Sequence, residues 1–251
     1  MVVFNSLLSV AVFSVLGALA VPHVGTNLTT RAGTPSSKGI HDGFFYSWWT
    51  DGGATATYTN EPKGQFSVTW EYGSGGNLLG GKGWSPGSHT RVMSYTGTYQ
   101  PSGNSYLAVW GWTRDPVIEY YIIESFGSYN PSSFLMKKGT VTADGSVYDM
   151  GVYFRSNEVS SSTQFYSVRR NKRTKGTVDL GAHFRAWEAA GMRLGASHDF
   201  QILVCEGYFS SGSCNMTVSE VGSTDTAATT LEANRDAVDP IPAANLEGPA
   251  R

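Results

Sequence analysis

The sequence predicts an all-β fold, a two-sheet β-jelly-roll sandwich with one short helix, and three observations support it. Short runs rich in β-branched and aromatic residues recur along the chain between turn residues. Thirty glycines, thirteen tyrosines, twelve phenylalanines and seven tryptophans favour strands and turns over helices. A chain of 251 residues is long enough for one sizeable domain.

Strand signals run from about residue 43 to residue 220. Alternating apolar and polar positions predict the following strands: Gln65–Tyr72, Arg91–Tyr99, Ser105–Thr113, Val117–Ser125, Gly139–Val141, Val147–Arg155, Thr163–Arg170, Phe200–Tyr208 and Cys214–Ser219. Asp144-Gly145 and Ser211-Gly212 are typical of hairpin turns. One helix is predicted over Ala182–Ala190, with Gly191 as its C-terminal stop.

The two ends of the chain differ in composition from the β region. The apolar run Leu7–Leu19 followed by Ala20 predicts a secretory signal peptide over residues 1–20, and the run is too short and too rich in serine for a membrane anchor. Residues 21–38 are expected to form a propeptide or flexible leader, and residues 39–220 the β-jelly-roll domain. Residues 221–251 lack aromatic side chains and are expected to be disordered. We therefore expect a secreted protein.

Charge and composition narrow the possible partners. The formal net charge is −2, which gives no support for a nucleic acid or an anionic membrane as partner. Many aromatic residues combined with few charges suit a neutral sugar, whose C–H faces pack on aromatic rings. The five histidines lack metal-ligand spacing, so no metal or other cofactor is expected. We expect the protein to be a monomer.

Two covalent modifications can be considered. A hairpin turning at Ser211 would place Cys205 opposite Thr217, so the sequence favours two buried thiols over a bond to Cys214. Asn27-Leu28-Thr29 and Asn215-Met216-Thr217 are glycosylation sequons, and the second lies in a predicted strand, where it is less available.

Glu119 and Glu206 are the strongest candidates for chemistry. Each lies in a β-branched and aromatic run, where a charge costs free energy unless it has a partner or a task. A single glutamate on a strand is usually solvated, but two of them suit a retaining glycosidase, which needs one nucleophile and one acid/base.

Strand alternation predicts the neighbours of these carboxyls. Residues two apart on a strand share a face, so Glu119 is grouped with Tyr121 and Glu206 with Tyr208. The same rule groups further polar and aromatic residues: Tyr106 with Trp110 and Trp112, Gln164 with Tyr166, and Arg155 with Tyr153. If these strands are neighbours, one sheet face carries two carboxylates, an arginine, an amide and many aromatic rings, which is typical of a sugar cleft.

Five stretches in this order resemble glycoside hydrolase family 11, the small β-jelly-roll endo-1,4-β-xylanases. The resemblance covers about residues 43 to 220 and rests on these segments: Tyr46–Gly53, Asn77–Trp84, Gly111–Tyr121, Tyr166–Arg170 and Glu206–Ser213. It implies hydrolysis of internal β-1,4 bonds of xylan with retention of configuration, and a carboxyl separation of about 5–5.5 Å.

The resemblance also implies individual roles. Glu119 matches the nucleophile and Glu206 the acid/base, which first protonates the leaving oxygen and then activates water. The substrate-binding residues that it implies are Trp49, Asn77, Trp110, Tyr121, Arg155, Gln164 and Tyr208. Among these, Trp49 matches a tryptophan that stacks on xylose, and Asn77 matches the neighbour of the acid/base. An amide cannot share the acid/base proton as an aspartate would, so we predict a near-neutral pH optimum.

Three departures from the family pattern stand out. Trp110 occupies the position of a tyrosine near the nucleophile, and Phe200 that of a tyrosine on the acid/base strand. The "thumb" hairpin keeps only residues 156–162 between its strands and lacks a Pro-Ser-Ile tip, which predicts a more open cleft. Two alternatives therefore stay open: a xylan-binding or host-signalling protein with low turnover, and a related β-1,4-glucanase.

Overall fold

The computed structural model describes residues 33–72, 76–156 and 161–221, and within them the chain forms two sheets. The larger sheet has nine strands, in the spatial order β1 (Ser37–His41), β2 (Phe44–Thr50), β5 (Asn77–Trp84), β13 (Ser197–Tyr208), β7 (Ser105–Arg114), β8 (Ile118–Phe126), β11 (Ser161–Arg169), β10 (Ser146–Ser156) and β9 (Met136–Ala143). The smaller sheet has five strands, in the order β12 (Gly176–Asp179), β6 (Val92–Ser102), β14 (Ser211–Glu220), β4 (Gln65–Glu71) and β3 (Thr55–Asn60).

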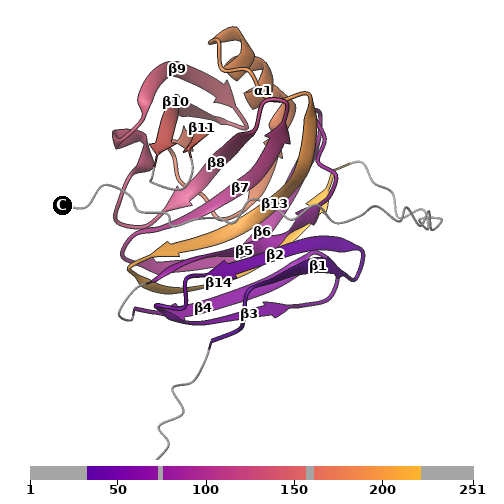
Figure 1. The fold of residues 1–251 in the computed structure, drawn as a ribbon, viewed down its shortest axis with the longest axis vertical. Helices are drawn as coiled ribbons and strands as arrows, with labels where there is room; N and C mark the ends of the chain where they lie inside the picture. The colour runs from indigo at the N-terminus through magenta and orange to yellow at the C-terminus, as the bar shows by residue number, and fades with distance from the viewer. Residues whose placement is uncertain (1–32, 73–75, 157–160, 222–251) are drawn as a thin grey trace, which may run out of the picture. The chain divides into compact units, whose positions relative to one another are not determined.

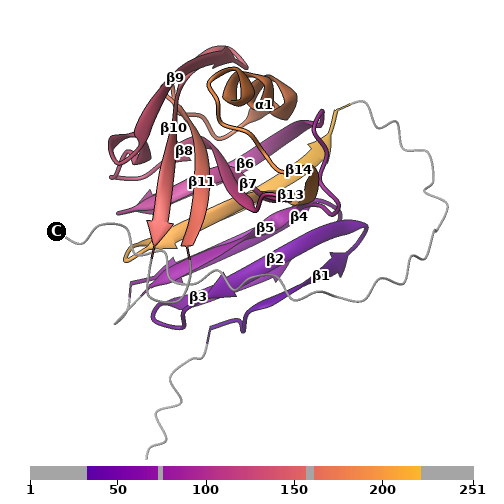
Figure 2. The ribbon, with the colours of Figure 1, turned by 45° about the horizontal axis from the view of Figure 1, so that its top comes forward.

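The nine-stranded sheet is strongly curved, and the five-stranded sheet packs against one of its faces (Figures 1 and 2). Neighbouring strands are antiparallel except β8 and β11, which run parallel with Glu119 opposite Gln164. The remaining elements are the helix α1 (Leu180–Ala189) and the 3₁₀ turn η1 (Pro131–Ser133). This is the predicted two-sheet fold with one short helix.

The nine strands predicted from alternation are all present, within a few residues of the expected bounds. Asp144 and Gly145 both have positive φ and join β9 to β10 as a hairpin, as predicted. The helix begins two residues earlier than predicted because Asp179 caps it by accepting a hydrogen bond from the Ala182 N–H. Gly191 follows the helix with φ +76°, as expected for its stop.

Strand β5 was not predicted, because three of its eight residues are glycines and glycine weakens a strand signal. The structure shows why they are needed. A Cβ added at Gly81 would lie 1.7 Å from the Leu203 carbonyl oxygen, and one at Gly83 would lie 2.2 Å from that of Gln201. The β13 backbone therefore approaches β5 at distances that only glycine permits.

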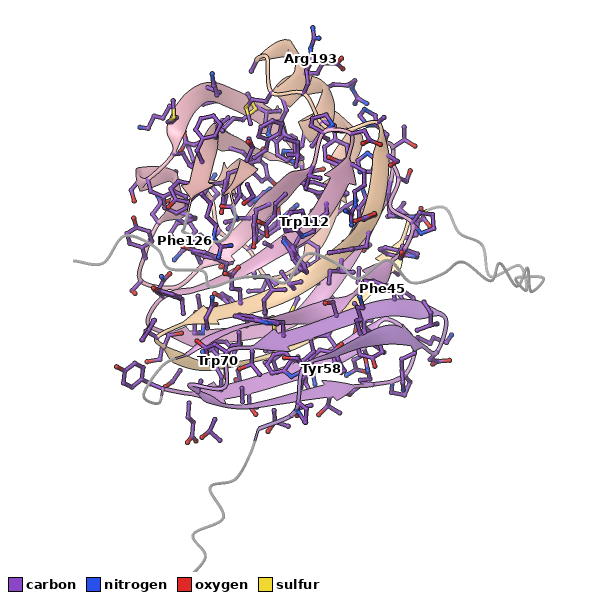
Figure 3. The ribbon with its side chains drawn as sticks, in the orientation of Figure 1. Phe45, Tyr58, Trp70, Trp112, Phe126 and Arg193 are labelled. Atoms are coloured by element: carbon purple, nitrogen blue, oxygen red, sulfur yellow. A yellow bond between two sulfur atoms is a disulfide. The ribbon has the colours of Figure 1, made fainter. Side chains whose placement is uncertain are left out.

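A continuous apolar core fills the space between the two sheets. Tyr58 and Trp70 point into it from the five-stranded sheet, whereas Phe45 and Trp112 lie on the nine-stranded sheet (Figure 3). The helix seals one end with Trp187, which is fully buried and donates a hydrogen bond to Ser167 Oγ at 2.9 Å. A second apolar cluster covers the opposite face of the nine-stranded sheet. We call that face the outer face.

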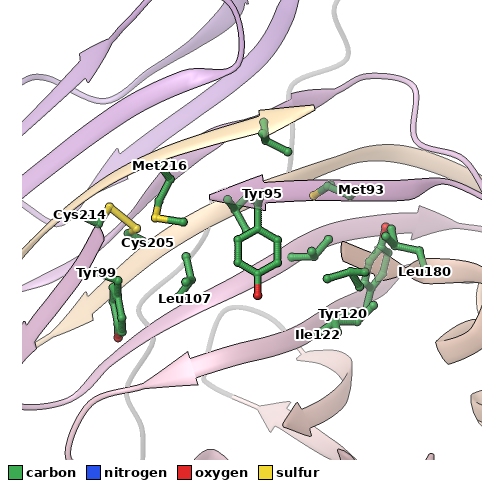
Figure 4. Packing of buried hydrophobic residues seen from close by; sticks show 14 of the residues in the cluster. Met93, Tyr95, Tyr99, Leu107, Tyr120, Ile122, Leu180, Cys205, Cys214 and Met216 are labelled. Carbon is green, nitrogen blue, oxygen red and sulfur yellow. A yellow bond between two sulfur atoms is a disulfide. The ribbon is translucent and has the colours of Figure 1, made fainter. Parts of the chain in front are cut away.

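The prediction of two free thiols was wrong, because Cys205 and Cys214 form a disulfide with a Cα–Cα distance of 6.7 Å. The error came from assuming a hairpin at Ser211-Gly212. Strand β13 belongs to the nine-stranded sheet and β14 to the five-stranded one, so the chain crosses between sheets and the strands do not pair. The bond therefore links the two sheets through the core (Figure 4).

The first described strand lies at the predicted boundary between leader and domain, residue 39. Strand β1 starts at Ser37 and pairs with β2. Thr34 already contributes contacts, because its carbonyl accepts a hydrogen bond from Trp48 Nε1 at 2.8 Å. The predicted signal peptide, most of the predicted leader, the first sequon and the segment beyond residue 221 lie outside the described residues. Within the described residues, no helix is long and apolar enough to cross a membrane.

Candidate active site

The outer face of the nine-stranded sheet gathers the candidate residues from seven strands. They are Trp49 on β2, Asn77 on β5, Glu206 and Tyr208 on β13, Trp110 on β7, Glu119 and Tyr121 on β8, Gln164 on β11 and Arg155 on β10. Strand pairing aligns them across the sheet: Trp49 and Glu206 each stand opposite Leu79, and Asn77 stands opposite Tyr208. The structure therefore brings the predicted set onto one face.

Glu119 is 2% exposed and accepts three hydrogen bonds. Trp110 Nε1 donates to its Oε1 at 2.7 Å, and the Tyr121 hydroxyl donates to the same oxygen at 3.1 Å. Gln164 Nε2 donates to Oε2 at 2.5 Å. Both carboxylate oxygens are thus held by donors, which fixes the side chain and favours its charged form.

Burial raises the pKa of Glu119, and the three donors together with the charge of Arg155 oppose that rise. Glu206 is 3% exposed and lacks such support, because its Oε2 has no hydrogen-bond partner among the described residues. Burial, with a further contribution from the charge of Glu119, raises the pKa of Glu206 to about 8. The three donors therefore stabilise the carboxylate form of Glu119 against the effect of burial, whereas the raised pKa of Glu206 holds its proton at neutral pH.

Asn77 neighbours Glu206 on the outer face, since it lies two residues before Leu79 on β5. It is 2% exposed, and neither side-chain polar atom has a hydrogen-bond partner among the described residues. Its main-chain N–H donates to Asp51 Oδ2 at 2.8 Å, which anchors the start of β5. A buried amide with unused donors and acceptors is unusual, and a bound substrate or water could satisfy it.

Aromatic rings line the outer face around the two glutamates. The Trp110 ring packs against Phe200 with centroids 4.8 Å apart, and Phe200 in turn packs against Phe45 at 5.5 Å. Trp49, for which the family resemblance implies stacking on xylose, is half-buried and lies on the same face, opposite Leu79. Arg155 is also half-buried, and its charge lowers the pKa of both carboxyls, so it lies near both.

Comparison of the sequence with known proteins identifies relatives of the chain. The family profile "Glycosyl hydrolases family 11" matches residues 41–217. The chain is 51% identical over 220 residues to "Endo-1,4-beta-xylanase" of Thermomyces lanuginosus, covering 85% of this chain and 97% of that protein. It is 55% identical over 230 residues to "Ethylene-inducing xylanase 1" of Verticillium dahliae, covering 87% and 100% respectively.

The chain belongs to glycosyl hydrolase family 11. The predicted family and the prediction of a glycoside hydrolase are therefore confirmed. The family match spans strands β2 to β13 completely and most of β14, so the whole outer face described above lies within it.

The sequence did not predict how this family 11 hydrolase orients Gln164. The Tyr166 hydroxyl donates to Gln164 Oε1 at 3.0 Å, which turns the amide so that its NH₂ group faces Glu119. Tyr166 also stacks on Tyr121 with centroids 5.1 Å apart and planes 7° apart. The signal was present in the alternation Gln164-Phe165-Tyr166, which places both polar side chains on the outer face.

Glu124 is a second buried glutamate on β8, and it shows why burial alone does not mark an active site. It lies five residues after Glu119, so it points to the inner face, where Arg173 Nε and the hydroxyls of Tyr95 and Tyr148 donate to its carboxylate. Its charge is thus matched by a cation and two donors within the core. Neither carboxylate oxygen of Glu124 is left for chemistry.

The hairpin that carries the predicted short thumb is formed by β10 and β11, paired from Tyr148–Arg169 to Ser156–Ser161. The strands hold Arg155 and Gln164 as expected. The tip, residues 157–160, lies outside the described residues, so the shortened lid stays a prediction. Among the described residues, no group of three or more His, Cys, Asp or Glu side chains could hold a metal ion.

Proposed function

We propose that this protein is a secreted endo-1,4-β-xylanase that hydrolyses internal bonds of xylan by a retaining double displacement. One observation carries the proposal: two buried carboxyls share the outer face, and Glu119 accepts three hydrogen bonds whereas Glu206 Oε2 has no partner among the described residues. Glu119, with three donors, is suited to attack as a carboxylate, and Glu206, with a pKa raised to about 8, is suited to donate a proton.

In the first step, the Glu119 carboxylate attacks the anomeric carbon while Glu206 gives its proton to the departing glycosidic oxygen. The glycosyl-enzyme bond removes the charge of Glu119, which is one cause of the raised pKa of Glu206. Glu206 can then remain ionised and take a proton from water. That water attacks the anomeric carbon and releases Glu119.

The substrate class is inferred from the relatives, whose names specify xylanases, and from the uncharged aromatic lining of the outer face. Stacking on Trp49 would leave little room for the hydroxymethyl group of glucose. Parallel assays on xylan and soluble cellulose separate the xylanase from the β-1,4-glucanase. A faster release of reducing ends from cellulose would contradict the proposal.

The roles of the two glutamates can be tested separately. Both Glu119→Gln and Glu206→Gln should lower reducing-sugar release from xylan by at least about 10³-fold. With an aryl xyloside whose leaving group needs no proton, added azide should give the β-xylosyl azide with Glu206→Ala, because azide attacks the glycosyl-enzyme, and the α-xylosyl azide with Glu119→Ala, because azide then displaces the leaving group directly. A parent enzyme no faster than its glutamine variants would instead support the xylan-binding alternative. The first sugar released should be the β anomer by NMR.

A further inference from the structure

An exposed pair of aromatic residues lies where the outer face ends, next to Tyr208. Phe209 is 46% exposed and packs edge-on against the Tyr208 ring, with centroids 4.7 Å apart. Tyr72 is 61% exposed and lies 6.3 Å from Phe209, centroid to centroid. The three rings form a continuous series that leads away from the glutamates. We call Tyr72 and Phe209 the aromatic ledge.

The backbone conformation of Phe209 is independent evidence that its ring has a functional role. Its φ is +47°, a region that bulky residues rarely adopt and that glycine or asparagine would occupy at lower cost. Such conformations are strained, and they concentrate at functional sites. A large apolar side chain is thus held, half-exposed, at a position where the local backbone does not favour it.

The ledge is also rigidly placed. The Phe209 N–H donates to the Gly76 carbonyl at 2.8 Å, and the Tyr72 N–H donates to Ser211 Oγ at 2.9 Å. These bonds join the end of β4, the start of β5 and the crossing from β13 to β14. The Cys205–Cys214 disulfide closes the segment that contains Phe209. Fixed aromatic surfaces bind with little loss of conformational entropy.

From these observations we propose that the aromatic ledge binds a further sugar unit of the xylan chain, on the leaving-group side of the cleaved bond. The inference rests on the proposed function and extends it to residues beyond the carboxyls. The ledge residues carry no charge and expose aromatic rings, which suits a neutral pyranose. Their continuity with Tyr208 places the ledge on the path of a long chain.

The course of β13 indicates on which side of the cleaved glycosidic bond the ledge lies. The strand passes Phe200, which packs on Trp110 beside the proposed nucleophile, then reaches Glu206 and ends at Tyr208. The ledge therefore lies beyond the acid/base, on the side away from the nucleophile. The acid/base protonates the departing oxygen, so sugar units beyond it belong to the leaving group.

Two variants remove the ledge without touching the carboxyls. Phe209→Asn deletes the ring with a residue that tolerates positive φ, and Tyr72→Ala deletes the second ring. Ile40→Ala is the matched control, because Ile40 is an exposed apolar residue on β1, at the edge of the sheet. Thermal unfolding of each variant shows that it is folded before kinetics are compared.

The expected result is a loss that depends on chain length. For Phe209→Asn and Tyr72→Ala, kcat/KM on xylohexaose should fall about two- to tenfold, whereas kcat/KM on xylotetraose should change less than about twofold. On xylohexaose labelled at its reducing end, cleavage should shift toward that end, because fewer units are held in the leaving group. Ile40→Ala should match the parent in both measurements.

An equal loss of kcat/KM on both oligosaccharides, or an unchanged cleavage position, would overturn the proposal that the ledge binds a sugar unit. Calorimetric measurement of xylohexaose binding distinguishes failure of the ledge proposal from failure of the proposed function. If the parent cleaves neither oligosaccharide, the proposed function fails, and the affinity for xylohexaose still tests the ledge. Weaker binding by Phe209→Asn than by the parent would then support it, and equal affinities would exclude it.

Discussion

Trp110 sets the environment of Glu119 in a way that a tyrosine would not. Its indole N–H donates to Oε1 at 2.7 Å and cannot accept a proton or a hydrogen bond in return. The contact therefore acts only to stabilise the charged carboxylate. The ring packs on Phe200, so the donor is held in place by an apolar contact and not by other polar groups.

We predict that Trp110→Phe lowers kcat/KM on xylan by about ten- to a hundredfold. The change removes a hydrogen bond to a charged group, worth about 1.5–3 kcal/mol, while most of the ring packing remains. The acid limb of the pH profile should also move upward, because Glu119 loses a donor that opposes the rise of its pKa. Trp112→Phe on the same strand is the control. An unchanged acid limb would show that the indole N–H does not act on the carboxylate.

The pKa of Glu206 predicts the alkaline limb of activity. Because this group must be protonated before the first step and has a pKa of about 8, kcat/KM should decline above about pH 8. The optimum should then be near neutral, in agreement with the expectation from Asn77. A pH–rate profile that peaks below about pH 4 would contradict the assignment.

Asn77→Asp should move the alkaline limb to lower pH. A protonated aspartic acid beside Glu206 would donate a hydrogen bond to its carboxylate and so lower its pKa. The pair would then titrate as a unit. The pH dependence of kcat/KM for the variant and the parent, measured on one soluble substrate, checks the shift, and Asn77→Ser serves as an uncharged control.

At the scale of elements, alternation and turn residues were sufficient for the strands that carry Glu119, Gln164 and Glu206. Each of these strands is rich in β-branched and aromatic residues, so its local signal agrees with its final place. Strand β5 could not be predicted in the same way. Its glycines are required because the β13 backbone approaches closely, and this tertiary contact leaves no signal in the local sequence.

The disulfide was missed for a related reason. A short connection between two strands suggests a hairpin, and the sequence contains nothing that signals a crossing between sheets. The positive φ of Phe209, at that crossing, could not be predicted from a residue type that disfavours it. The carboxyls and the grouping of Gln164 with Tyr166 were predicted from the alternation of single strands, whereas the ledge depends on how strands are joined.

We predict that Cys205→Ala combined with Cys214→Ala lowers the free energy of unfolding by about 2–3 kcal/mol. The bond closes a loop with a sequence separation of 9, and it ties the two sheets together within the core. Urea unfolding of the variant and the parent measures the difference. Reduction of the parent should reproduce it, and equal stabilities would show that packing alone holds the sheets together.

At the scale of the molecule, the curved sheet buries two carboxyls away from water, and this desolvation lowers the stability of the folded protein. In the unfolded chain a glutamate titrates near 4.3, whereas Glu206 in the folded protein titrates near 8. Between these values the folded state binds more protons than the unfolded state. The contribution of Glu206 to stability is therefore full below about pH 4 and is lost as the pH rises toward about 8.

Glu206→Gln should remove this loss of stability with rising pH. The variant should be more stable than the parent by an amount that grows between about pH 4 and pH 8 and reaches the order of a few kcal/mol. Denaturant unfolding across that range measures the difference, with the exposed Glu71→Gln as control. A stability difference that does not vary with pH would mean that Glu206 is not desolvated in the folded protein.

The parallel pairing of β8 with β11 has a consequence for how activity relates to folding. The hydrogen bond from Gln164 to Glu119 joins residues 45 apart in sequence, and it exists only while these two strands are in register. A slip of one residue would turn Gln164 toward the core and leave the carboxylate without that donor. Turnover in a refolding mixture therefore counts the molecules in which β8 and β11 are paired in the correct register, a property that secondary-structure signals cannot report.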